Sequence, residues 1–104
     1  MKVEQFYNKN QFHLYGDGYH YLQSYNSLVV KVDRNRNTNI VSPYGYIKII
    51  TLGSDWDYST TTSKHVYMFL EEYGNISFNG IRNKRAYIQK LIDDDIIGYD
   101  ENMR

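Results

Sequence analysis

The sequence contains no cysteine and only one proline, and neither sign of charge is in excess. Without cysteine the chain has no disulfide framework, no thiolate metal site and no thiol catalysis. Twelve basic side chains balance twelve acidic ones, so no overall field draws the protein toward DNA or a membrane surface. No apolar run is long enough for a transmembrane helix, and the first residues do not form a signal peptide. We therefore expect a protein of the cytoplasm, in a bacterial host cell.

A length of 104 residues suits one domain with one core, so we expect a single domain over residues 1–104. The most unusual feature is an excess of tyrosine: twelve tyrosines against four phenylalanines. AT-rich codons would explain part of this bias, because Asn, Ile and Lys are also abundant. Binding surfaces also favour tyrosine, and both explanations remain open.

The stretch from Trp56 to Tyr73 is the clearest structural feature of the sequence. It predicts a helix that is preceded by N-cap residues. Ser59 to Ser63 is an unbroken run of hydroxyl residues, which suit a helix N-cap better than a helix interior. One of Ser59, Thr60 and Thr61 should be the cap. The residues that follow at helical spacing, and should face the core, are Thr62, Val66, Phe69, Leu70 and Tyr73. Gly74 and Asn75 then fit a left-handed helix end.

Residues 28–32 and 46–52 predict two strands before this helix. In the first of them, Leu28, Val30 and Val32 should share the buried face, with Val29 on the other. Residues 12–15 and 40–41 could add short strands, and the segment 42–45 fits a turn around Pro43. A second helix is expected over 81–95, fraying at its acidic end over 93–95, followed by a last short strand at 96–99. The sequence therefore predicts an α+β domain: a small antiparallel sheet of three to four strands with two helices packed on one face.

Two segments together resemble a family of short proteins encoded by bacteriophages and mobile elements. They are Tyr-Asn-Ser-Leu-Val-Val at 25–30 and the signature W-D-Y-S-x-T-T-x-K-H-x-x-x-F-L at 56–70. The resemblance covers about half the chain and implies a phage or prophage setting with no known reaction. Some small phage proteins of this kind bind and inhibit host proteins, and anti-CRISPR inhibitors are an example. By that analogy, we expect an inhibitor that contacts a host or defence protein such as a CRISPR nuclease.

Protein binding is the function that the residues themselves favour, because the N-terminal tyrosines exceed what a core of this size needs. Tyrosine supplies rigid amphipathic area and arginine supplies anchoring hydrogen bonds. The residues expected to bind the partner are Tyr15, Tyr19, Tyr21, Tyr25, Arg34 and Arg36. The same surface could serve a homodimer, formed by pairing of edge strands, and a monomer is equally compatible with the sequence.

Nucleic acid is the alternative partner, since Arg34 and Arg36 lie in one predicted loop and tyrosines are available for stacking. The second predicted helix adds further basic residues: Arg82, Lys84, Arg85 and Lys90. The zero net charge opposes this alternative. A third hypothesis is a nucleotide sponge, in which the hydroxyl run binds an anion through Ser59, Thr60, Thr61 and Lys64. Simple helix capping is the more ordinary explanation of that run.

No residues point to catalysis, a metal or a cofactor. The three histidines, His13, His20 and His65, lack the spacing of a zinc site. A serine lies near His65, but nothing marks a nucleophile turn or an oxyanion hole. We therefore expect a binding protein that is not an enzyme.

Overall fold

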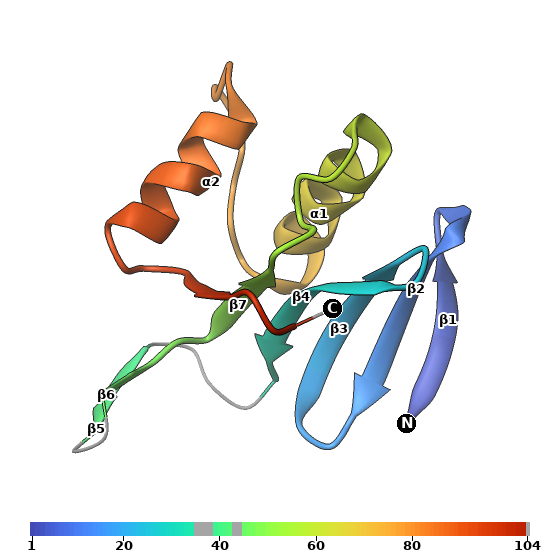
Figure 1. Ribbon diagram of the computed structural model, residues 1–104, viewed down its shortest axis with the longest axis horizontal. Helices are drawn as coiled ribbons and strands as arrows, with labels where there is room; N and C mark the ends of the chain where they lie inside the picture. The colour runs from blue at the N-terminus through green and yellow to red at the C-terminus, as the bar shows by residue number, and fades with distance from the viewer. Residues whose placement is uncertain (35–38, 43–44, 104) are drawn as a thin grey trace.

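In the computed structural model, the residues described are 1–34, 39–42 and 45–103 (Figure 1). The elements in chain order are β1 (Lys2–Phe6), β2 (Asn8–Gly16), β3 (Tyr19–Ser24), β4 (Ser27–Asp33), β5 (Ile40–Ser42), β6 (Gly45–Ile47), β7 (Ile50–Gly53), α1 (Thr60–Tyr73), α2 (Lys84–Asp93) and β8 (Gly98–Asp100). Six of the strands form one sheet in the order β1-β2-β3-β4-β7-β8. The pair β5–β6 forms a separate hairpin.

The α+β class and the two helices are as predicted, but three to four antiparallel strands is too few. The main sheet has six strands and is mixed, because β8 runs parallel to β7. The first 24 residues, in which only 12–15 were expected as a possible strand, form three of these strands. Gln11 and His13 are buried although they are polar, and this hides the alternation of β2. The turns at Tyr7 and Tyr25 place tyrosines at positive φ, 62° and 55°, where sequence patterns lead one to expect Gly or Asn.

Two further expectations about the strands were wrong. Residues 46–52 do not form one strand: β6 pairs with β5, whereas β7 joins the main sheet beside β4. In β4, Val29 and Val30 are both fully buried. A bulge between β3 and β4 opposes Leu22 to Val30 but Gln23 to Leu28, so that one extra residue is inserted and the alternation shifts at Val29. The turn expected at 42–45 includes residues 43 and 44, which lie outside the described residues.

Helix α1 begins where the hydroxyl run predicts. Ser59 is the N-cap, and its Oγ accepts a hydrogen bond from the backbone N–H of Thr62 at 3.1 Å. The buried row of α1 consists of Thr62, His65, Val66, Phe69 and Leu70, and it packs on β3 and β4. The helix ends at Gly74, whose φ is −94°, and the left-handed residue is Asn75 rather than the glycine.

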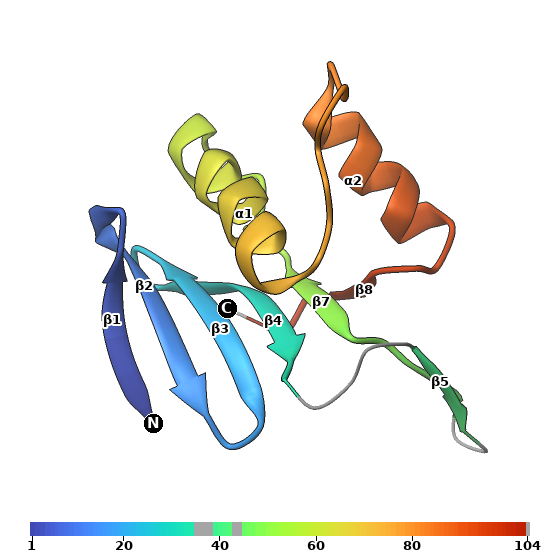
Figure 2. The same ribbon diagram turned by 180° about the vertical axis from the view of Figure 1, so that it is seen from behind.

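Helix α2 starts three residues later than expected, because the side chain of Asn83 caps it by accepting from the N–H of Ala86. Ile88 of α2 is fully buried and belongs to the hydrophobic core. Figures 1 and 2 show both helices on the same side of the sheet. On the opposite side, the C-terminal segment passes close to β7, because a Cβ added at Gly53 would lie 2.5 Å from the carbonyl oxygen of Met103. Among the described residues, no helix is both long and apolar enough to cross a membrane.

The cap assignment predicts that Ser59→Ala lowers the free energy of unfolding by about 1 kcal/mol, because the N–H of Thr62 loses its acceptor. Thr60→Ala is the matched control, since Thr60 is exposed at the first helical position and its side chain caps nothing. Urea unfolding of the two variants checks the assignment. Equal losses of stability in both variants would contradict it.

Candidate functional site

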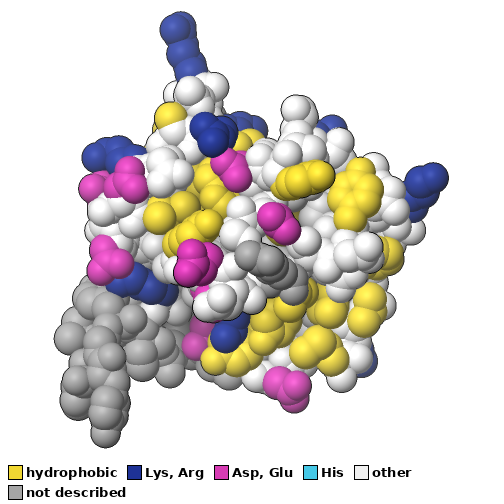
Figure 3. All heavy atoms as spheres, in the orientation of Figure 1, with side chains coloured by type: hydrophobic (Ala, Val, Ile, Leu, Met, Phe, Trp, Pro, Cys, Tyr) yellow, Lys and Arg dark blue, Asp and Glu magenta, His cyan; other side chains and the backbone are white. Residues whose placement is uncertain are grey.

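The strand pairing divides the tyrosines between the two faces of the sheet, since directly opposed residues share a face. Leu22 and Val30 are opposed and lie on the face that α1 covers. Tyr21 is opposed to Leu14 of β2 and to Lys31 of β4, and therefore lies on the other face. We call this second surface the open face and define it by Val3, Phe12, Leu14, Tyr19, Tyr21, Leu28 and Lys31. Figure 3 shows hydrophobic side chains gathered over β1 to β4 on this side.

Tyr19 and Tyr21 form the aromatic centre of the open face. Their ring centroids are 5.9 Å apart with the planes tilted by 45°. The ammonium group of Lys31 lies 4.2 Å from the centroid of the Tyr19 ring, within the range of a cation–π contact. Neither tyrosine hydroxyl has a hydrogen-bond partner within the part of the chain that is described. Two partly exposed rings therefore lie on a surface that no helix covers, and their hydroxyl groups make no hydrogen bond within the described residues.

The other residues expected to bind a partner do not all join this face. Tyr25 lies at the β3–β4 turn and is 47% exposed. Tyr15 points to the helix side, where its ring stacks on His13 and its hydroxyl donates to the carboxylate of Glu4 at 2.9 Å. Arg34 is exposed, and its N–H donates to Gly18 at the β2–β3 turn, next to Tyr19. Arg36 lies outside the described residues.

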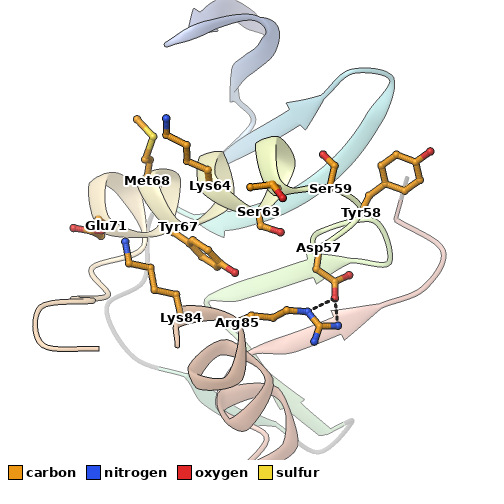
Figure 4. A pocket seen from close by; sticks show the side chains of 11 residues that line it. Asp57, Tyr58, Ser59, Ser63, Lys64, Tyr67, Met68, Glu71, Lys84 and Arg85 are labelled. Atoms are coloured by element: carbon orange, nitrogen blue, oxygen red, sulfur yellow. Dashed lines mark hydrogen bonds and ion pairs between the residues drawn. The ribbon is translucent and has the colours of Figure 1, made fainter. Parts of the chain in front are cut away.

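A groove of about 710 Å³ separates the start of α1 from the start of α2 (Figure 4). It is lined by Asp57, Tyr58, Ser59, Thr60, Ser63, Lys64, Tyr67, Met68, Glu71, Lys84 and Arg85. Of the residues expected to bind an anion, Ser59, Thr60 and Lys64 line the groove, whereas Thr61 does not. Sequence reasoning did not associate Lys84 and Arg85 with this run, because only the packing of α2 beside α1 brings them near it.

The groups of the groove do not converge on one anion. Arg85 donates two hydrogen bonds, 2.7 and 3.0 Å long, to the same carboxylate oxygen of Asp57. The Oγ of Ser59 already accepts the capping hydrogen bond. Figure 4 shows Lys64 and Lys84 on either side of α1, with Arg85 turned toward Asp57. The carboxylate of Glu71 further opposes a bound anion.

Two histidines form a polar pair beneath α1. His13 Nε2 and His20 Nδ1 lie 2.8 Å apart and share a hydrogen bond. The ring of Tyr73 lies against both, at centroid distances of 4.4 and 4.5 Å. Burial lowers the pKa of both imidazoles, and the charge of Arg34 lowers them further, while Glu4 and Glu72 partly raise the pKa of His13. Within the described ranges, no group of three or more His, Asp or Glu side chains could hold a metal ion.

The chain belongs to a family of unknown function, DUF8033, whose model matches residues 1–89. The matched segment includes every strand of the main sheet except β8, together with the whole of α1. No curated protein and no solved structure is significantly similar to the chain.

The lowered pKa values of His13 and His20 predict a loss of stability in mild acid. The unfolded histidines titrate near 6.5, so the unfolded chain binds more protons as the pH falls through this value, and the free energy of unfolding decreases. Urea titrations at pH values above and below 6.5 measure this decrease. A variant with both histidines changed to glutamine should lose this part of the pH dependence. An unchanged pH dependence in that variant would contradict the assignment.

Proposed function

We propose that this protein acts by binding another protein through the open face of its sheet, without catalysing a reaction. The observation that carries the proposal is the pair of partly exposed rings, Tyr19 and Tyr21, which lie beside Lys31 on the sheet face that α1 does not cover. Rigid amphipathic rings lose little conformational entropy on binding, and a partner can both pack on them and hydrogen-bond their hydroxyls.

The surroundings of the two tyrosines support the same proposal. Val3 is 60% exposed and lies opposite Leu14, so apolar area continues from the tyrosines to the edge strand. At the other end of the face, Lys31 and Arg34 supply positive charge near Tyr19. An apolar centre with polar and charged groups around it is the usual anatomy of a protein interface.

We further propose that the partner is a host or defence protein, such as a CRISPR nuclease, and that the chain is a phage-encoded inhibitor. This step rests on the resemblance of residues 25–30 and 56–70 to small phage proteins. Contact is the proposed means of inhibition, because the groove and the histidine pair offer no arrangement suited to chemistry.

A nucleic acid is the second candidate partner, and one observation favours it. Tyr19 and Tyr21 lie next to Lys31 on a sheet face that no helix covers, and aromatic rings beside cations can stack bases and contact phosphates. The net charge of zero counts against an extended contact with phosphates.

Changing both Tyr19 and Tyr21 to alanine should weaken partner binding at least about 30-fold, the effect of losing an interface hot spot of about 2 kcal/mol. Inhibition of the target should be lost with it, whereas the melting temperature should change little. The partner is first captured with the wild-type protein from a lysate that contains a defence nuclease, and affinities are then measured by calorimetry.

The matched control changes Tyr58 and Tyr99 to alanine. These two tyrosines are 80% and 50% exposed, and neither belongs to the open face. The control should bind the partner as the wild-type protein does. Equal losses in both variants, or unchanged binding by the first, would contradict a role for the open face.

Salt and nuclease treatment distinguish the two candidate partners. A protein partner should survive nuclease treatment of the lysate and remain stoichiometric. A nucleic-acid partner should disappear with nuclease, and its affinity should fall steeply as salt is raised. The first result is the one we expect.

A further inference from the structure

Strand β1 is an uncovered edge of the main sheet. It is the first strand in the sheet order, and among the described residues its one pairing partner is β2. Residues 2–5 are all exposed, and Figures 1 and 2 show no other element beside the strand. An edge strand presents a row of N–H and C=O groups that can pair with another chain. β1 contains no proline, and its first irregularity comes only between Gln5 and Phe6.

The symmetry of a dimer restricts how two copies of β1 could pair. An isologous antiparallel pair has its two-fold axis perpendicular to the sheet, so the same face of both copies points the same way. Residues opposed across the axis must then come from the same face, which means even positions opposite even ones and odd opposite odd ones. An axis beside Gln5 would carry the pairing into the irregularity between Gln5 and Phe6, so the registers to compare have the axis beside Lys2, Val3 or Glu4.

Charge selects one of these registers. An axis beside Lys2 would oppose two lysines, and an axis beside Glu4 would oppose two glutamates; both arrangements are unfavourable. An axis beside Val3 instead places each Lys2 opposite the partner's Glu4. The two symmetric charge pairs are then both attractive, and the ladder runs from Met1 to Gln5 without reaching the bulge.

The same register also buries apolar surface. Val3 is 60% exposed on the open face, next to Leu14. With the axis beside Val3, the two Val3 side chains oppose each other and shield one another from water. The tripeptide Lys2-Val3-Glu4 is thus complementary to itself in charge and in shape.

We propose that β1 is a self-association edge, through which a second copy of this chain extends the sheet antiparallel about Val3. The proposal does not depend on the nature of the partner that the open face binds. A dimer of this kind sets the open faces of two copies side by side on one continuous sheet. A partner with repeated subunits could then be bound at two points.

The test exchanges the charges of β1. Sedimentation velocity of the wild-type protein, from micromolar to millimolar concentration, should show a monomer–dimer equilibrium. Lys2→Glu and Glu4→Lys each convert both attractive pairs into repulsive ones, and each should weaken the dimer at least about tenfold. An equal mixture of the two variants should form a heterodimer, because all opposed charges are then opposite in sign. The variant with both changes should dimerise as the wild-type protein does.

Lys9→Glu is the matched control, because it makes the same charge change at an exposed position of β2, away from the edge. It should leave the dimer unchanged, and thermal unfolding should show that every variant is folded. A wild-type protein that stays monomeric throughout the series would overturn the proposal. A Lys2→Glu variant that dimerises normally, or a mixture that does not combine, would also overturn it.

Discussion

The structure depends on the packing of α1 across β3 and β4. Phe69 and Leu22 are both fully buried in the core, and a hydrogen bond of 2.9 Å joins the hydroxyls of Ser24 and Thr62 between β3 and α1. Burying these groups on one side fixes the orientation of every strand in the sheet, because a slip of one residue would turn the apolar set outward. The side that α1 does not cover is the open face. The candidate binding surface is therefore a consequence of where the core lies.

The division of the tyrosines follows from the hairpin between β2 and β3. Its register opposes Tyr15 to His20, and both side chains face α1. Tyr19 and Tyr21 stand at the alternate positions of β3 and face away. Tyrosine thus serves two purposes in one chain. On the helix side it packs with the histidine pair, and on the open face it leaves amphipathic area available to a partner.

The open face extends to the uncovered edge strand β1, so the charges of that edge affect how the open face can associate. Exposed apolar residues on a sheet favour unspecific association, which proteins commonly restrain with charges along the edge. Lys2 and Glu4 supply such charges on β1, while Lys31 interrupts the apolar area at the other end. In the proposed dimer, the order of these two charges along β1 also distinguishes the register about Val3 from the others.

The sequence by itself determined the helices and the fold class. Two local features mark α1 in the sequence: the hydroxyl run that begins at Ser59, the N-cap, and the apolar row that includes Phe69 and Leu70. The sequence also indicated that Tyr15, Tyr19, Tyr21 and Tyr25 exceed the needs of the core, but it did not separate Tyr15, which lies on the helix side, from the others. Only the tertiary structure decided the strand count, the parallel pairing of β8 and the face on which each tyrosine lies. Those depend on the bulge at Val29 and on turns at Tyr7 and Tyr25, whose positive φ values the residue types do not signal. The meeting of Arg85 with Asp57 was equally hidden, because long-range packing has no local signature in the chain.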